Sequence, residues 1–149
     1  PGVLAVHASD PGLMLGYLGA EDETAARFSG DWFLTGDMVT MGAAGEIAYL
    51  GRADDMMNAG GVRVSPLEVE AVLATHPGIA EVACAEVTVK ADTTVIAAFY
   101  TGPEDVPEAE LQAFAGARLA RYKQPRHYQR VDALPRSGNG KVNRRALRR

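Results

Sequence analysis

The stretch from Gly51 to Glu70 constrains the fold most, because it joins a sharp chain reversal to a helix start. It opens with a charged turn, passes through small residues that include Gly60 and Gly61, and reaches Arg63. The two glycines have no Cβ atom, so they permit unusual backbone dihedrals or the close approach of a ligand. Arg63 carries a planar five-donor guanidinium, which suits a carboxylate or a phosphate. The stretch therefore predicts a tight turn beside a fixed positive charge.

A helix is expected directly after this loop. Ser65 has the side chain of an N-cap, Pro66 suits the first helical position, and Glu68 can bond back to the cap as in a capping box. The helix is predicted to run to about His76, where a Pro-Gly pair stops it.

The residues after this helix predict a compact α/β unit with a small sheet and two main helices. The further elements expected in it are strands at 79–89 and 93–100 around a polar turn at 90–92, a helix from a second capping box at 105–108 to about 122, a strand at 127–131, a flexible loop at 136–140 and a final helical turn at 143–149.

The residues before this unit predict a β-rich piece. Its expected elements are a strand at 3–7, a short helix at 21–28 with Asp22 as a start signal, an extended run at 32–34, and a turn at 42–45 that leads into a strand at 46–50. The fold class is therefore α/β (α+β) in two parts, residues 1–53 and residues 54–149.

The composition excludes several classes of protein. With 149 residues, of which 47% are hydrophobic, the chain can bury a core, yet no apolar run approaches the length of a membrane span. No cationic-then-apolar signal segment opens it, and its single cysteine, Cys84, cannot form an internal disulfide. These features predict a cytoplasmic protein.

Charge is unevenly distributed along the chain. The net charge is −4, but from Arg118 to the end the basic residues crowd together, with Asp132 as the only acid. Such a region is either a solvated surface or a site for a polyanion, such as a nucleotide triphosphate or coenzyme A. Nucleic acid is not an expected partner, because zinc spacing, a recognition-helix motif and an aromatic stacking pattern are lacking. The histidines are scattered, so no metal site is expected.

Three motifs follow one another along the chain: Gly-Asp-Trp-Phe-Leu-Thr-Gly-Asp at 30–37, the stretch at 51–70, and Pro-Arg-Ser-Gly-Asn-Gly-Lys-Val-Asn-Arg at 135–144. Together they resemble the signature motifs of the adenylate-forming superfamily, which comprises acyl-CoA synthetases, adenylation domains of nonribosomal peptide synthetases and firefly luciferases. The resemblance covers nearly the whole chain.

This resemblance implies a division of the chain and an incomplete first part. Residues 1–53 resemble the final β-rich subdomain of a large N-terminal AMP-binding domain, and residues 54–149 resemble its mobile C-terminal domain. In the family a phosphate-binding loop and the acyl pocket precede this point. We find no such loop here, so the chain is expected to be a fragment of a longer protein.

The resemblance also implies a catalytic residue and a nucleotide site. Forming an acyl adenylate joins a carboxylate to the α-phosphate of ATP, so the site needs positioned positive charge. Lys141 matches the family lysine that bridges these two anions and is the expected catalytic residue. The positions that match ATP- and AMP-binding residues are Thr35, Asp37, Arg52 and Arg63, with the Asp37 carboxylate on the ribose hydroxyls.

Two further matches concern movement and the second substrate. Asp54 matches the hinge about which the C-terminal domain of the family rotates between two catalytic arrangements. Gly60 and Gly61 match the lining of the pantetheine tunnel, where a thin thiol arm passes close to the backbone.

Each of these assignments has an ordinary structural alternative. Asp37 can cap a turn, and Arg52 can form a surface ion pair with Asp54 or Asp55. Lys141 can be a solvated charge in a basic tail, and the glycine pair can simply make a turn. The resemblance favours the functional interpretation without excluding the structural one.

The function implied for the whole protein is that of an ATP-dependent acyl-CoA synthetase. It would activate a carboxylic acid as acyl-AMP and transfer it to coenzyme A, with ATP, Mg²⁺ and coenzyme A as co-substrates and no bound prosthetic group. The rest of the N-terminal domain would be its partner, and the 149-residue chain alone is expected to be inactive. Two alternatives stay open: an adenylation domain that loads a carrier protein, and a non-catalytic C-terminal domain that binds nucleotide, coenzyme A or a partner chain.

Overall fold

The computed structural model describes residues 1–91 and 93–148. The chain divides into two compact units, Pro1–Asp54 and Asp55–Arg149, called here the N-terminal unit and the C-terminal unit. This division falls one residue after the boundary that the sequence predicts. Asp92 of the predicted turn and Arg149 of the predicted last helical turn lie outside the described residues.

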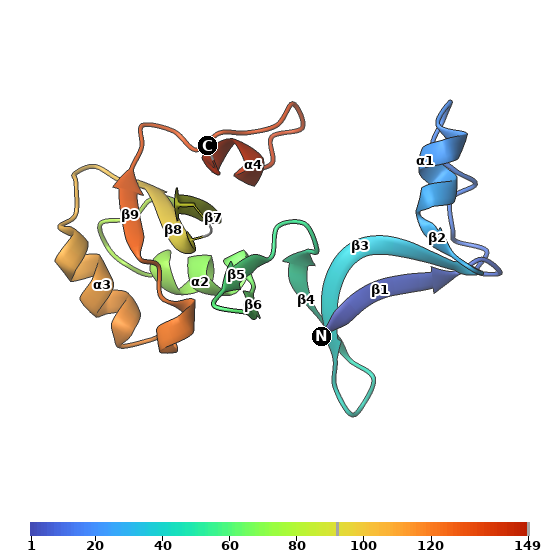
Figure 1. The fold of residues 1–149 in the computed structure, drawn as a ribbon, viewed down its shortest axis with the longest axis horizontal. Helices are drawn as coiled ribbons and strands as arrows, with labels where there is room; N and C mark the ends of the chain where they lie inside the picture. The colour runs from blue at the N-terminus through green and yellow to red at the C-terminus, as the bar shows by residue number, and fades with distance from the viewer. Residues whose placement is uncertain (92, 149) are drawn as a thin grey trace. The chain divides into compact units, whose positions relative to one another are not determined.

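The N-terminal unit is built on one long strand. Strand β3 (Trp32–Met41) pairs antiparallel with β1 (Gly2–His7), β2 (Phe28–Ser29) and β4 (Ile47–Arg52). The predicted turn at 42–45 is confirmed between β3 and β4, where the Gly45 N–H donates to the Gly42 carbonyl (Figure 1).

The predicted helix at 21–28 is shorter in the structure. Helix α1 (Glu21–Ala26) follows Ala20, whose methyl side chain offers no cap, so the proposed start signal at Asp22 is wrong. The helix also ends before Phe28, because that residue enters the ladder of β2 opposite Phe33.

The C-terminal unit contains a mixed three-stranded sheet in the order β7-β8-β9. Strands β7 (Glu81–Lys90) and β8 (Thr93–Thr101) are antiparallel, and β9 (His127–Arg130) runs parallel to β8. The other elements are a hairpin of β5 (Met57–Ala59) and β6 (Val62–Val64), helices α2 (Pro66–Leu73), α3 (Glu108–Gly116) and α4 (Arg144–Leu147), and the 3-10 turn η1 (Arg121–Lys123). The predicted α/β class is confirmed.

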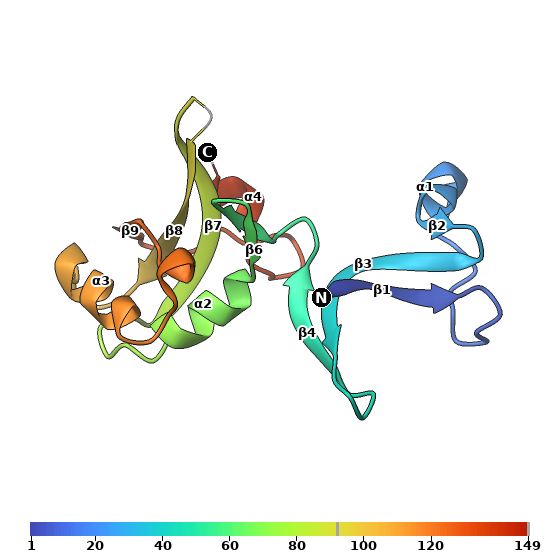
Figure 2. The same cartoon turned by 60° about the horizontal axis from the view of Figure 1, so that its bottom comes forward.

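Side-chain alternation along the strands gives this sheet two buried faces. One face packs against α2 and α3 in a cluster that includes Val69, Leu73, Ile96, Leu111 and Ala115. The other face is covered by α4 and the segment before it, in a cluster that includes Ala83, Ala97, Phe99, Leu134 and Leu147. Figure 2 shows α2 and α3 on one side of the sheet and α4 on the other.

The two predicted capping boxes have different outcomes. The Ser65 hydroxyl accepts the Glu68 N–H at 3.4 Å, which confirms Ser65 as the N-cap of α2. The second box is wrong, because the Asp105 carboxylate accepts the Tyr100 hydroxyl at 2.7 Å and α3 begins after Pro107 without a side-chain cap.

Both main helices are also shorter than predicted. Helix α2 ends at Leu73, and α3 ends at Gly116 because glycine is a poor helix former. The chain then turns so that Leu119 enters the first cluster, and Tyr122 lies in η1.

Candidate functional site

The structure brings Thr35, Asp37 and Arg52 together in the N-terminal unit. Asp37 and Arg52 lie directly opposite each other on β3 and β4. The Arg52 Nη1 donates to Asp37 Oδ1 and to the Thr35 carbonyl oxygen, each at 2.9 Å. The Thr35 hydroxyl donates to the Leu4 carbonyl at 2.9 Å and accepts the Asp37 N–H at 3.1 Å. A carboxylate and a guanidinium are thus held in fixed positions by the strand ladder.

Position 36, between Thr35 and Asp37, requires glycine. Its φ of 77° is left-handed, a conformation that costs other residues energy. A Cβ atom at this position would lie 2.8 Å from Arg52 Nη2, so a side chain here would displace the guanidinium. Of the two alternative partners proposed for Arg52, Asp54 forms only a long contact, with its Oδ1 3.9 Å from Arg52 Nε, and Asp55 pairs with Arg144.

Gly60 and Gly61 occupy the two-residue turn of the β5–β6 hairpin, where the sequence predicts only a loop. Their φ angles of 61° and 89° match the turn that joins right-twisted strands. A Cβ atom on either would meet nothing within 4 Å, so these glycines serve the backbone conformation rather than close packing. The Asn58 side chain accepts the Gly61 N–H at 2.8 Å, and Arg63 pairs with Asn58 across the hairpin.

Lys141 lies at the end of a hydrogen-bonded turn, residues 136–142, called here the Lys141 turn. Arg136 and Val142 pair as an antiparallel bridge, and the Ser137 N–H donates to the Lys141 carbonyl at 2.8 Å. The Arg136 guanidinium closes the turn by donating to the Gly140 carbonyl at 2.9 Å. The predicted flexible loop is therefore a closed turn, and the side chain of Lys141 is exposed at its end.

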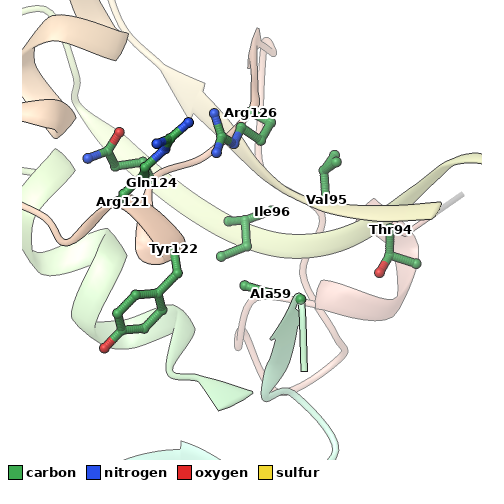
Figure 3. Close-up of a pocket in the computed structure, with 9 residues that line it drawn as sticks. Ala59, Thr94, Val95, Ile96, Arg121, Tyr122, Gln124 and Arg126 are labelled. Atoms are coloured by element: carbon green, nitrogen blue, oxygen red, sulfur yellow. The ribbon is translucent and has the colours of Figure 1, made fainter. Parts of the chain in front are cut away.

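A pocket of about 430 Å³ lies beside the glycine hairpin in the C-terminal unit (Figure 3). It is lined by Ala59, Gly60, Thr94, Val95, Ile96, Arg121, Tyr122, Gln124 and Arg126. The strand residues make an apolar floor, and the segment at η1 adds two guanidinium groups and one aromatic ring. Such a lining suits a ligand that carries both phosphate and an apolar or aromatic part.

Sequence analysis singled out some of the residues that line this pocket but did not predict that they lie together. Arg121 and Arg126 belong to the basic region noted from the charge distribution, and Gly60 to the glycine loop. Their proximity depends on the parallel pairing of β9 with β8, which brings the segment before β9 beside β8. No local pattern records that pairing.

Sequence analysis also missed a largely buried charge cluster of Arg144, Glu70 and Asp55. Arg144 Nη2 lies 2.8 Å and 2.9 Å from the two carboxylate oxygens of Glu70, and Arg144 Nη1 lies 3.4 Å from Asp55 Oδ2. The arginine and Glu70 side chains are each 12% exposed. Burial lowers the pKa of Arg144, but the hydrogen bonds and charge of Glu70, with the charge of Asp55, raise that pKa above its ordinary value.

The single cysteine lies next to this cluster. The Cys84 N–H donates to Glu70 Oε1 at 2.7 Å, and the side chain is fully buried. Burial raises the pKa of the Cys84 thiol well above its ordinary value, and the Glu70 charge adds to this increase. A thiol held neutral in this way is not a nucleophile at neutral pH.

Within residues 1–91 and 93–148, no group of three or more His, Cys, Asp or Glu side chains is arranged to hold a metal ion. Over the same residues, no helix combines the length and the apolar character needed to cross a membrane.

Comparison with known proteins gives one family model and many relatives. Residues 68–141 match the AMP-binding enzyme C-terminal domain. The chain is 37% identical over 136 residues to the 2-succinylbenzoate--CoA ligase of Bacillus pumilus, covering 91% of this chain and 28% of that protein. It is also 34% identical over 156 residues to a dimodular nonribosomal peptide synthase of Bacillus subtilis, covering 99% of this chain and 7% of that protein.

Solved structures give the same result. The o-succinylbenzoate CoA synthetase of Bacillus subtilis, in complex with its acyl-adenylate intermediate, superimposes with a TM-score of 0.89 at 32% identity, over 99% of this chain and 30% of that one. The same enzyme in complex with ATP and magnesium ion gives a TM-score of 0.88 at 32% identity, over 98% of this chain and 30% of that one. The chain thus spans less than a third of these relatives and corresponds to their C-terminal portion.

Proposed function

We propose, from the premise that this chain belongs to the adenylate-forming superfamily through its AMP-binding enzyme C-terminal domain, that the whole protein is an ATP-dependent acyl-CoA synthetase. The observation that carries the proposal is the similarity to o-succinylbenzoate CoA synthetase along 99% of the chain, since that enzyme is seen with an acyl-adenylate. The protein would act on a carboxylic acid with ATP, Mg²⁺ and coenzyme A, in the cytoplasm.

In the first half-reaction, a carboxylate oxygen attacks the α-phosphorus of ATP, and pyrophosphate leaves with the electron pair of the broken P–O bond. Asp37 accepts hydrogen bonds from the two ribose hydroxyls, and Arg52 holds that carboxylate in place through its 2.9 Å bond. Thr35 and Arg63 complete the nucleotide contacts. Lys141 bridges the attacking carboxylate and the α-phosphate, so its positive charge offsets their repulsion.

In the second half-reaction, the thiol of coenzyme A attacks the acyl carbonyl carbon, AMP leaves, and the thiol proton is lost. The C-terminal unit rotates about Asp54 between the two half-reactions. Gly60 and Gly61 line the path of the pantetheine arm. The pocket beside them receives the nucleotide end, with Arg121 and Arg126 on its phosphates.

One competing function has its own support. The 34% identity to a dimodular nonribosomal peptide synthase is close to the identity with CoA ligases, so a carrier protein is the alternative acceptor. A non-catalytic domain that binds nucleotide, coenzyme A or a partner chain is the third candidate.

The test incubates the whole protein with ATP, Mg²⁺ and a panel of aromatic, alicyclic and aliphatic carboxylic acids, with and without coenzyme A. Mass spectrometry follows acyl-AMP and acyl-CoA. We expect both products with at least one acid, and no acyl-AMP from the 149-residue chain alone. Acyl-AMP that never reaches coenzyme A would favour the carrier protein, and failure with every acid would favour the non-catalytic domain.

A further inference from the structure

We infer that Arg144 is a positioning residue for adenylation, because it clamps the segment that carries Lys141 to the body of the C-terminal unit through Glu70 and Asp55. This inference rests on the role of Lys141 in the proposed function. Arg144 itself need not touch any substrate.

The clamp joins three segments that are distant in sequence. Glu70 lies in α2, Asp55 is the first residue of the C-terminal unit, and Arg144 is the first residue of α4. The guanidinium makes a two-pronged contact with Glu70 at 2.8 and 2.9 Å, and its Nε adds a third contact at 3.2 Å. Both carboxylates face one arginine, so its removal would leave two largely buried negative charges side by side.

Arg144 lies close to Lys141 along the chain. Lys141 and Arg144 are three positions apart in the sequence, so their Cα atoms can be no more than about 11 Å apart. Between them, the Asn143 N–H donates to the Pro135 carbonyl at 2.7 Å, and the Asn143 side chain accepts the Ala146 N–H at 3.3 Å. A shift of Arg144 would therefore be transmitted to the base of the Lys141 turn.

Helix α4 cannot hold this position alone. It has four residues, and helices of that length have no independent stability. Leu147 anchors its C-terminal end by packing against the sheet, and Arg144 anchors its N-terminal end, which is the end nearer to Lys141. The Lys141 turn is likewise tied at its own base by the ion pair of Arg136 with Glu81.

Positioning matters more for Lys141 than for an ordinary surface lysine. Its side chain is exposed and flexible, so the only precision available to its charge comes from its backbone. Misplacing a reacting group by about 1 Å can cost about 100-fold in rate. The clamp thus serves the first half-reaction, in which Lys141 acts, and not the second.

The experiment measures the two half-reactions separately in the whole protein, with the acid found in the activity screen. Acyl-AMP formation is followed by pyrophosphate exchange, and thioester formation by mixing synthetic acyl-AMP with coenzyme A. The variants are Arg144→Ala, Arg144→Lys and Glu70→Gln, and the matched control is Arg145→Ala, which removes an exposed arginine from the same helix.

We expect Arg144→Ala to lower kcat of adenylation about 100-fold, with KM for ATP and the rate of thioester formation unchanged within about twofold. Arg144→Lys should restore part of the rate, because an ammonium keeps the charge but loses the two-pronged contact. Arg145→Ala should behave as the wild type. Equal losses in both half-reactions, or full adenylation activity in Arg144→Ala, would overturn the inference.

Amide hydrogen exchange supplies a readout that does not depend on turnover. In Arg144→Lys and Glu70→Gln, exchange at residues 137–141 should accelerate about tenfold or more, while β8 stays protected. If the wild-type protein makes no acyl-AMP, the proposed function fails, and unchanged exchange in these variants would separately show that the clamp does not hold the turn. If Arg144→Ala does not fold, the two milder variants decide.

Discussion

The two sets of candidate residues are held by different kinds of structure. Thr35, Asp37 and Arg52 lie within a paired strand ladder, and the Arg52 guanidinium donates to both the Asp37 carboxylate and the Thr35 carbonyl oxygen. Lys141 lies on a short exposed turn that is closed by hydrogen bonds among its own residues, and the chain after it is tied to Glu70 through Arg144. A sheet suits a site that only has to bind, whereas a turn on an anchored support suits a charge that has to be delivered to a bound substrate.

The largest effect should come from removing the positive charge of Lys141. We expect Lys141→Ala to lower the rate of acyl-AMP formation about 100- to 1000-fold, as for the loss of other groups that stabilise developing charge. Conversion of supplied acyl-AMP to acyl-CoA should continue. Pyrophosphate exchange and thioester formation measure the two effects, and a variant that loses both equally would contradict the assignment of Lys141 to the first step alone.

A smaller effect is expected at the proposed nucleotide site on β3 and β4. Asp37→Asn removes the charged acceptor for the ribose and weakens the bond from Arg52, so KM for ATP should rise by about tenfold or more. Glu46→Gln, an exposed carboxylate in the same unit, is the control. An unchanged KM in Asp37→Asn, measured by initial rates against ATP, would mean that Asp37 only supports the sheet.

Gly36 and Gly60, two of the glycines with a positive φ, allow the effect of backbone strain to be distinguished from damage to the candidate site. Gly36→Ala and Gly60→Ala should each lower the free energy of unfolding by about 1–2 kcal/mol. Gly36→Ala alone should also weaken ATP binding, because its Cβ atom meets Arg52, whereas the Cβ atom at Gly60 meets nothing within 4 Å. Urea denaturation and ATP titration test this pair, and equal effects on ATP binding would contradict it.

The smallest effect concerns Cys84, whose backbone N–H donates to Glu70. The pKa of Cys84 is raised above its ordinary value of 9.0, so above this pH the unfolded chain loses a proton that the folded chain keeps. The free energy of unfolding should therefore fall as pH rises past 9, by at most about 1.4 kcal/mol per pH unit from this group. Below pH 8 the same thiol should resist alkylation.

Denaturation at several pH values, with Cys84→Ala for comparison, checks this dependence. The slope between pH 9 and 10 should be smaller in the variant. An equal slope would show that the thiol is not held neutral by its surroundings.

Local sequence signals predicted the elements better than the contacts between them. Ser65 capped its helix because the cap, the proline and the first turn are adjacent in sequence. Asp105 carried the same signal three residues before Glu108, but the Tyr100 hydroxyl took its carboxylate, and this competitor belongs to another element. The glycine loop was recognised by its residues, yet the strands on either side of it are too short to show an alternating pattern.

The candidate site divides in the same way. Thr35, Asp37 and Arg52 were named from motifs, and the structure places them in contact. Arg144 was noted only as part of the motif around Lys141, because its partners lie 74 and 89 residues earlier in the chain. The pocket depends on the pairing of β9 with β8, which no nearby residue encodes.

The buried cluster also sets an order of assembly. The chain is synthesised from its N-terminal end, so Asp55 and Glu70 leave the ribosome well before Arg144, which is 89 and 74 residues further along. Until Arg144 has been synthesised, the carboxylates of Asp55 and Glu70 have no arginine to pair with at a position that is largely buried in the folded protein. Because contacts between such distant residues form late, the last piece to settle should be the one that carries Lys141. In the proposed function, a newly made protein would then be able to bind its nucleotide before Lys141 was in place for the reaction.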